Sequence, residues 1–449
     1  MVSRNDTGLD SVLHSLQSTT DPHRKIDRSF ISGGKPSIQV VPAFLRGIKN
    51  VERLFSPDII AIGPYHRDEP RLQSMEDIKK MAANEFCCSS TAHQVRDFYL
   101  NVQEVAEQAR ESYAHDVRLN DDDFTAMLFF DGCFLLQFMT MVALDRGPQK
   151  LWKMPQLSEN WMQRISRDIL LVENQIPWVV LEALMRLKHV LVDRYIADTI
   201  SNFDVKGAKP QVDCEGADRY QPFHLLDLVR HRQIGPFRSR MVAVADEAEA
   251  PRPILNISSA LELAEVGVHI TAGKTARLSD MGVGKKNPLF GNLWLPPVYL
   301  SELTMSLLIN MAAFEMLQGG TSDADYGASS YMQIMAVLMN REDDVRELRA
   351  KRILYPVFSD QETLDFFKSV CPYLQYGRQY DRVLQRLSHY QQDRTVRVAL
   401  HKFVYNNLKY LLTSGSAFGL LIPILRAVLS LKDTNRSAPG APPRALRQR

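Results

Sequence analysis

Residues 124–144 read FTAMLFFDGCFLLQFMTMVAL, an apolar stretch whose one charge is Asp131. The stretch is long enough to cross a bilayer, which takes roughly 20 residues. However, Asp131 and Gly132 lie in its first half, where a charge is costly in lipid. The amphipathic segments on either side also need a partner for their apolar faces. We therefore predict that residues 124–144 form a buried central helix.

Helical patterns continue on both sides of this stretch. Residues 75–118 contain few helix breakers, and their apolar residues recur at spacings of three and four, which predicts two long helices. Further on, the apolar runs 169–172 and 176–181 are divided by the polar tripeptide 173–175. Pro177 fits the first turn of a new helix.

The remaining segments complete a mainly α pattern. Gly267 ends a helix that leads into a strand-like segment, and Pro296-Pro297 precede an apolar helix. The loop-like stretches 203–222 and 233–256 indicate surface connections. The predicted elements are a helix and strand within 259–270, a helix over 301–317, two helices within 329–370, one or two helices within 376–412, and extended pieces near 59–62 and 267–295.

The sequence thus predicts a mainly α protein, a large single helical domain with a few short strands and a C-terminal apolar helix. The N-terminus is polar and shows no sustained apolar period. The predicted parts are a mobile N-terminal arm (1–37), a helical domain (38–409), an apolar helix that is a candidate membrane segment (410–431) and a basic disordered tail (432–449).

Composition and charge exclude several classes of protein. With 45% hydrophobic and 24% charged residues, the chain is globular rather than collagen-like or wholly disordered. Its 54 basic and 52 acidic residues give a net charge of +2. Residues 432–449 hold five basic residues and one acid, a charge of +4, so the other residues sum to −2. A nucleic-acid-binding body is therefore disfavoured.

The cysteines and the N-terminus indicate a reducing compartment. Five irregularly spaced cysteines are too few for a disulfide framework. The sequence contains no C-x-x-C motif, so a structural zinc site is not expected. The N-terminus lacks the apolar core of a secretory signal, so synthesis into the cytosol is expected.

Motifs that would carry chemistry are mostly incomplete. The stretch GVGKK (282–286) lacks the first glycine and the final hydroxyl residue of a phosphate loop, and neither G-x-S-x-G nor H-E-x-x-H occurs. A helix over HLLDLVRH would place His224, Asp227 and His231 on one face, which could bind a divalent ion. We favour the simpler interpretation that the neighbouring apolar residues are buried and these three lie in water. No catalytic, cofactor-binding or metal-binding residue is predicted.

Five polar residues lie in apolar surroundings and need partners: Asp131, Glu173, Asn174, Gln175 and Glu315. They are either internal hydrogen-bonding groups that join helices or catalytic acids. The structural role is the favoured interpretation, because a helix break leaves backbone groups that such side chains can satisfy.

These same residues carry a resemblance to the plant "domain of unknown function 247" family, also called UPF0481. The chain resembles that family from about residue 38 to beyond 400. The most diagnostic segments are IGPYH (62–66) and LVENQIP (171–177). The other matching segments are 41–79, DGCFLLQFM (131–139), RDILLVENQIPWVVLEAL (167–184), FHLLDLVR (223–230), SALELAEVGVHI (259–270) and LPPVYLSELTMSLLINMAAFE (295–315).

The resemblance implies little chemistry, because the family lacks an established enzymatic activity. Its members often end in one transmembrane segment, and some grass members are male determinants of self-incompatibility. The motif residues, to which no catalytic role can be transferred, are Ile62, Gly63, Pro64, Tyr65, His66, Glu76, Asp131, Gly132, Glu173, Asn174, Gln175 and Pro177.

The C-terminal apolar segment, 410–431, departs from the family pattern because it contains Pro423 and Arg426. Its charge-free part, 410–425, is marginal for spanning a bilayer, although Arg426 could reach the headgroups. The alternatives are a helix lying in an anionic membrane interface and a core helix followed by a basic tail. A location at a membrane, such as the plasma membrane, is expected, with the cytoplasm as the alternative.

The favoured function is non-enzymatic recognition of an unidentified protein partner, together with membrane contact through residues 410–431 and the basic tail. No nucleic acid, small molecule or cofactor is predicted as a partner. One alternative is a pollen-side self-incompatibility determinant, as for some grass members. The other is an enzyme with a buried carboxylate and histidine site, which requires His66 to meet Glu76 or Glu173.

Overall fold

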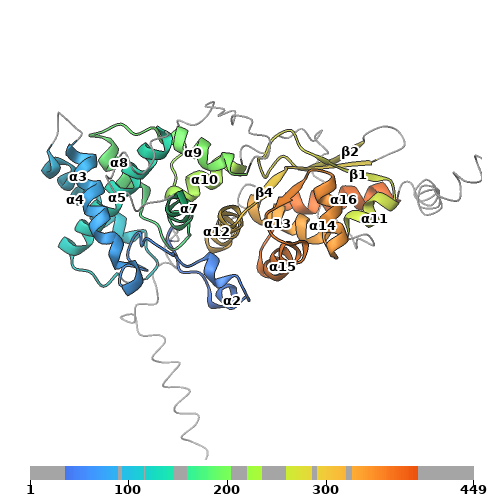
Figure 1. Ribbon diagram of the computed structural model, residues 1–449, viewed down its shortest axis with the longest axis horizontal. Coiled ribbons are helices and arrows are strands. Elements are labelled where there is room, and N and C mark those ends of the chain that lie inside the picture. The colour runs from blue at the N-terminus through green and yellow to red at the C-terminus, as the bar shows by residue number, and fades with distance from the viewer. Residues whose placement is uncertain are drawn as a thin grey trace, which may run out of the picture.

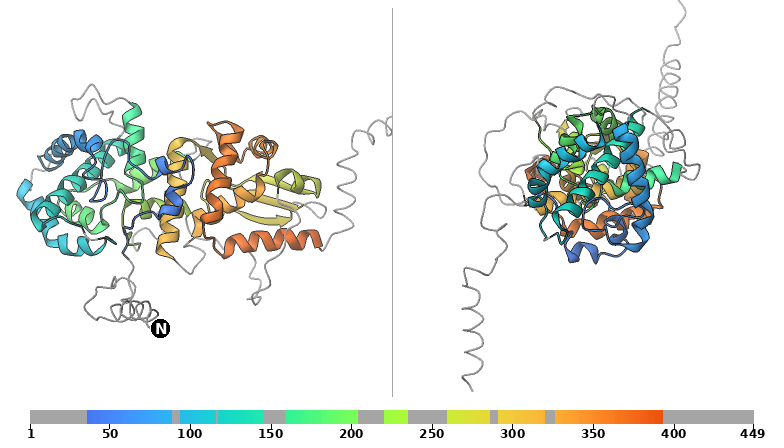
Figure 2. Two further views of the ribbon diagram at one scale, coloured as in Figure 1. Left: turned by 90° about the horizontal axis from the view of Figure 1, so that it is seen from below. Right: turned by 90° about the vertical axis from the view of Figure 1, so that its left-hand side faces the viewer.

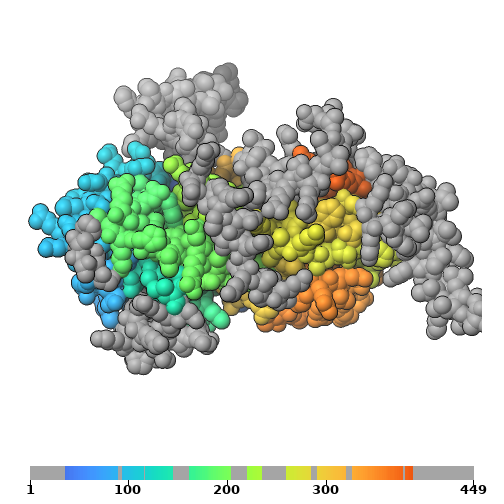
Figure 3. Space-filling view, turned by 90° about the horizontal axis from the view of Figure 1, so that it is seen from above, coloured from blue at the N-terminus to red at the C-terminus, as the bar shows by residue number. Residues whose placement is uncertain are grey.

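Helices dominate an elongated molecule (Figure 1), which confirms the predicted mainly α class. Residues in the first half of the chain lie at one end and residues in the second half at the other, as the space-filling view also shows (Figure 3). The computed structural model describes residues 36–88, 94–115, 117–144, 159–203, 220–234, 259–285, 291–319 and 326–392. The predicted segments 410–431 and 432–449, and residues 1–35 of the arm, lie outside these ranges.

The first half of the chain is a helical bundle around α5 (Asp121–Ala143). The Asn120 side chain caps this helix by accepting a hydrogen bond from the Asp123 amide at 2.8 Å. Three aspartates in the first turn interact favourably with the positive end of the helix dipole. The other helices of this half are α2 (Ala43–Arg46), α3 (Glu76–Cys88), α4 (Val95–Glu111), α7 (Glu159–Asp168), α8 (Trp178–Met185), α9 (Val192–Ser201), α10 (Leu225–Ile234) and the short 3-10 helices η2 (Glu52–Leu54) and η3 (Pro70–Met75).

The packing around α5 confirms that residues 124–144 form a buried central helix. Helices α3, α4, α8 and α9 all pack against it. Among the described residues, α5 is the one helix long and apolar enough to cross a membrane, yet most of it is buried inside the protein. Gly132 allows α8 to approach closely, because a Cβ atom there would lie 2.7 Å from Leu184 Cδ1.

The second half combines helices with two small sheets. In the three-stranded sheet, β1 (Val268–Ala272) runs parallel to β3 (Gly291–Leu295), and β2 (Gly282–Lys285) runs antiparallel to β3. In the other sheet, β4 (Val298–Leu300) is parallel to β5 (Leu354–Pro356). The helices are α11 (Ala260–Glu265), α12 (Glu302–Gln318), α13 (Gly327–Leu338), α14 (Glu342–Ala350), α15 (Asp360–Val370), α16 (Arg378–Gln392) and the 3-10 helix η6 (Cys371–Tyr373).

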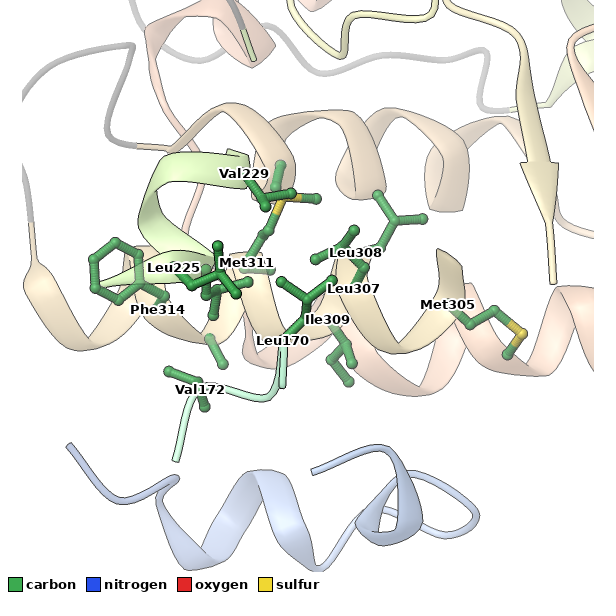
Figure 4. Close-up of a cluster of buried hydrophobic side chains, with 14 of the residues drawn as sticks. Leu170, Val172, Leu225, Val229, Met305, Leu307, Leu308, Ile309, Met311 and Phe314 are labelled. Carbon is green, nitrogen blue, oxygen red and sulfur yellow. The ribbon is translucent and has the colours of Figure 1, made fainter. Parts of the chain in front are cut away.

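The two halves meet at α12, whose buried side chains belong to the hydrophobic core of both halves. Figure 2 shows α2 beside α12 at the middle of the molecule. Leu170 and Val172, which follow α7, and Leu225 and Val229 of α10 surround the apolar side chains of α12 (Figure 4). Burying each such side chain contributes about 1.5–3 kcal/mol. The junction is therefore part of a continuous core.

Several element predictions were confirmed and two need correction. The two helices within 75–118 are α3 and α4, the segment 259–270 forms α11 and β1, and 301–317 is α12. Residues 329–370 contain parts of three helices rather than two, because the Asp344 carboxylate accepts from the Arg341 amide at the start of α14 and Ser359 caps the start of α15. Residues 59–62, predicted as an extended piece, pair with no strand, because the side chains of Asp168 and Asn174 bind their amides. Pro177 is the N-cap of α8 rather than part of its first turn.

Candidate functional site

Residues 60–66, which include the IGPYH motif (62–66), lie beside the motif segment 171–177, as the hydrogen bonds of the Asn174 side chain to their backbone show. Asn174 is fully buried, accepts a bond from the Ile62 amide at 2.6 Å and donates to the Ile60 carbonyl at 2.9 Å. Asp168 accepts from the amides of residues 58, 59 and 60 at 2.6–3.1 Å. These contacts give residues 58–62 the backbone partners that a sheet would otherwise supply.

Gln175 stabilises the turn on its other side. Its amide group donates to the Ile169 and Leu171 carbonyls at 2.8 and 2.9 Å, and its side-chain oxygen accepts from the Leu226 amide at 3.2 Å. Gln175 therefore links the turn after α7 to the start of α10. This confirms the structural role expected for polar residues next to a helix break.

Glu173 is the centre of a second group, the Glu173 cluster, which consists of Glu173, Arg46, His66 and Glu69. The Glu173 carboxylate accepts bonds from the Val41 amide and the Arg46 guanidinium, and its Oε2 lies 3.3 Å from His66 Nε2. On the other side of the ring, His66 Nδ1 lies 2.5 Å from Glu69 Oε1. His66 thus stands between two carboxylates, with Nδ1 hydrogen-bonded to Glu69 and Nε2 in close contact with Glu173.

The electrostatics of the Glu173 cluster favour charged carboxylates. Burial raises the pKa of Glu173, but the bonds from His66, the Val41 amide and Arg46 outweigh burial and hold it below its usual value. Glu69 behaves in the same way. Burial raises its pKa, but His66 and Arg71 together outweigh burial and hold the pKa below its usual value. A carboxylate that accepts several donors is stabilised in its ionised form.

Asp131, the one charge of the central helix, forms a buried ion pair. Its Oδ1 lies 2.7 Å from Lys79 Nζ, and its Oδ2 accepts from the Gly63 amide at 2.8 Å. Lys79 also contacts Glu76 Oε1 at 2.7 Å. Burial lowers the pKa of Lys79, yet Asp131 and Glu76 reverse this and raise it above its usual value, so the ammonium stays charged. The pair joins α3, α5 and the loop at Gly63.

The enzymatic alternative required His66 to meet either Glu76 or Glu173, and the structure shows the contact with Glu173. His66 meets Glu173, whereas Glu76 lies with Lys79 and Asp131. His66 and Glu173 are 7% and 2% exposed, respectively. A pocket next to the IGPYH motif is lined by Tyr65 and Arg67 but by neither His66 nor Glu173. The cluster therefore fastens the segment at Val41 to the core and offers little access to a substrate.

The proposed metal face of α10 serves other contacts. The Asp227 carboxylate accepts from the Tyr220 hydroxyl at 2.9 Å and the Phe223 amide at 3.0 Å. The His231 ring stacks on Tyr220 with centroids 3.6 Å apart. Within the described ranges, no group of three or more His, Cys, Asp or Glu side chains could hold a metal ion. Our expectation that all three residues lie in water was wrong, because His224 and Asp227 are buried.

Polar residues of the second half also cap helices internally. The Glu315 carboxylate accepts from the Ala328 and Ser329 amides at 2.9 and 2.8 Å and from Arg230 Nε at 3.0 Å. It therefore caps α13 from a neighbouring helix. Asn310 was missed by sequence reasoning, although it too stands in an apolar run: its side chain joins the Val172 amide to the Leu54 carbonyl.

Comparisons with known proteins agree on one family. Residues 38–422 match the model of DUF247, described as a plant protein of unknown function. The UPF0481 protein At3g47200 of Arabidopsis thaliana is 24% identical over 344 residues, covering 71% of this chain and 69% of that protein. A second UPF0481 protein of Arabidopsis thaliana, At3g02645, is 25% identical over 134 residues, covering 30% of this chain and 24% of that protein. No solved structure matches.

Proposed function

Because the chain belongs to the DUF247 family of plant proteins of unknown function, we propose, from its geometry, that it acts by binding another protein rather than by catalysis. The observation that carries the proposal is the use of the motif side chains inside the fold. Glu173, Asn174, Gln175 and Asp131 all bind backbone groups of distant segments. Buried polar networks of this kind specify a rigid arrangement.

The rigid arrangement presents an aromatic pair at the junction of the two halves. Phe44 of α2 and Tyr373 of η6 lie with ring centroids 6.1 Å apart, and they are 52% and 47% exposed. Arg46, in the same short helix as Phe44, is held by Glu173. Exposed aromatic side chains on a rigid support are typical of protein interfaces. The pair is our candidate for the centre of the partner-binding surface.

Proximity labelling tests this proposal in the native tissue. We would compare the tagged full-length chain with the double variant Phe44→Ser, Tyr373→Ser, and with Leu100→Ser, a control at a residue 41% exposed on α4. The double variant is expected to lose a defined set of labelled neighbours while its melting temperature stays unchanged, and the control is expected to keep that set. If the double variant labels the same neighbours as the wild type, the surface has been assigned wrongly.

An enzyme is the second candidate, favoured by the 3.3 Å approach of His66 to Glu173. Glu173→Gln distinguishes the two functions. If Glu173 joins segments, the change costs about 2–4 kcal/mol of unfolding free energy, because buried donors lose a charged acceptor. A catalytic acid held under strain would instead leave stability unchanged or raised. Urea denaturation decides between these outcomes.

Membrane attachment through residues 410–431 and the basic tail is part of the proposal and rests on sequence alone. Carbonate extraction of membranes tests it: the full-length chain should stay with the membrane, and a chain truncated before Tyr410 should wash off. If both wash off equally, the attachment is wrong. The narrower assignment as a pollen-side self-incompatibility determinant rests on family resemblance, and expression confined to vegetative tissue would remove it.

A further inference from the structure

A small pocket opens beside the IGPYH motif, between residues 64–68 on one side and His115 and residues 117–119 on the other. Its volume is about 190 Å³. This volume is smaller than the ~300 Å³ at the lower end of typical drug-sized sites. Its occupant must therefore be compact.

Both walls of this pocket are fixed by the fold. On one wall, the Tyr65 hydroxyl donates to the Ile38 carbonyl at 3.1 Å, and the ring lies edge-on to Tyr113. On the other wall, Arg110 donates to the Val117 and Leu119 carbonyls, both at 3.1 Å. A pocket held in this way needs little reorganisation to bind a ligand, which favours affinity.

The lining of the pocket is cationic. Among the described residues, Arg67, Arg118 and His115 line it together with the acidic Asp68. In the part of the chain that the structure describes, neither Arg67 nor Arg118 forms an ion pair. This contrasts with Arg46, Arg71, Arg110 and Arg167, which all bind carboxylates. Two arginines that form no ion pair in that part of the chain therefore line one small pocket.

We propose that this pocket binds a phosphomonoester group. The planar guanidinium donates paired hydrogen bonds that match phosphate oxygens, and a phosphomonoester carries a charge of about −1.5 to −2 at neutral pH, which two arginines balance. The apolar side chains of Val117 and Leu119 and the Tyr65 ring would contact the carbon atoms next to the ester. The group comes either from a free small metabolite or from a phosphorylated side chain of a protein.

Titration calorimetry on the full-length chain tests the site with O-phospho-L-serine as the probe and L-serine as the uncharged control. We expect saturable binding of the probe with a Kd of about 1 mM or tighter, and no binding of L-serine. The double variant Arg67→Gln, Arg118→Gln should bind at least about tenfold more weakly, because two charge-assisted contacts are lost. Arg96→Gln on α4, an exposed arginine without an ion pair among the described residues, is the matched control and should bind within about twofold of the wild type.

A phosphoserine peptide separates the two sources of the group. Tighter binding of the peptide than of free phosphoserine identifies a protein ligand, and equal or weaker binding identifies a free metabolite. Both variants should retain the wild-type circular dichroism and melting temperature, because neither Arg67 nor Arg118 is buried. Absence of saturation up to about 20 mM probe, or equal binding by the double variant, would overturn the proposal.

Discussion

The ion pair between Lys79 and Asp131 permits a quantitative test of how the motif residues stabilise the fold. The Nζ to Oδ1 distance is 2.7 Å, and the side chains are 2% and 1% exposed. Asp131→Asn keeps an oxygen that can accept from the Gly63 amide but removes the charge. Among the described residues, the Lys79 ammonium then keeps one ion-pair partner, Glu76, whose side chain is 30% exposed. The substitution thus isolates the charge of the pair.

The expected cost of Asp131→Asn is about 3 kcal/mol, the lower end of the range of ~3–5 kcal/mol for breaking a buried pair, because Glu76 still offers partial compensation. Lys79→Met is expected to cost a similar amount. The double variant leaves no unpaired charge, so it should cost about 3 kcal/mol rather than the sum of about 6. The coupling energy is then about 3 kcal/mol.

Urea denaturation at pH 7, followed by circular dichroism, gives the free energies for this cycle. Asp77 and Lys80 supply the matched control, since they form a 3.0 Å pair on the same helix with side chains 88% and 59% exposed. Their coupling should stay below about 0.5 kcal/mol. If the Lys79–Asp131 coupling is no larger than that of the control pair, the buried pair does not specify the fold as we describe.

Two further changes test the backbone and the charge state of the core. Gly63→Ala should lower the unfolding free energy, measured by urea denaturation, by at least about 2 kcal/mol. The reason is that Gly63 has φ +75° and an added Cβ would lie 2.5 Å from the Gln175 carbonyl oxygen. The control Gly47→Ala, where φ is −69° and the contacts are ordinary, should change the unfolding free energy by no more than about 0.5 kcal/mol. Burial lowers the pKa of His224 from 6.5 to about 4, so its neutral form contributes stability above pH 6.5 that is lost as the pH falls towards 4. His224→Gln should flatten the fall in unfolding free energy between pH 7 and pH 5, and an unchanged fall would contradict the assignment.

Elements with local signals were predictable from the sequence. The helix over 301–317 begins where Ser301 caps it and ends at Gly319, whose backbone is left-handed. The helix break before Pro177 was also predictable from the sequence, because proline lacks the amide N–H needed to continue a helix. Local capping and apolar spacing therefore placed the helices within 75–118 and 301–317 to within a few residues, but they did not separate the three helices within 329–370.

Long-range partners could not be predicted. Lys79 occupies a polar position in a helix and would ordinarily be exposed, and nothing in its neighbourhood points to Asp131, which lies on another helix. The partner of a buried carboxylate depends on how helices pack, which one sequence does not specify. By contrast, Asn310 was a missed signal, because an amide in an apolar run needs a partner as much as Glu173 does.

The junction at α12 has a consequence for how the chain folds during synthesis. Asn310 supplies the partner for the Val172 amide and the Leu54 carbonyl, and Gln318 donates to the Ser37 carbonyl at 3.2 Å. The first half therefore leaves the ribosome before α12 has been synthesised, so these backbone groups still lack their hydrogen-bond partners. Such non-local closure slows folding and leaves apolar surface exposed in the interval. A chain released before residue 302 should aggregate or be held by chaperones, whereas one released after α12 can complete the core of the first half.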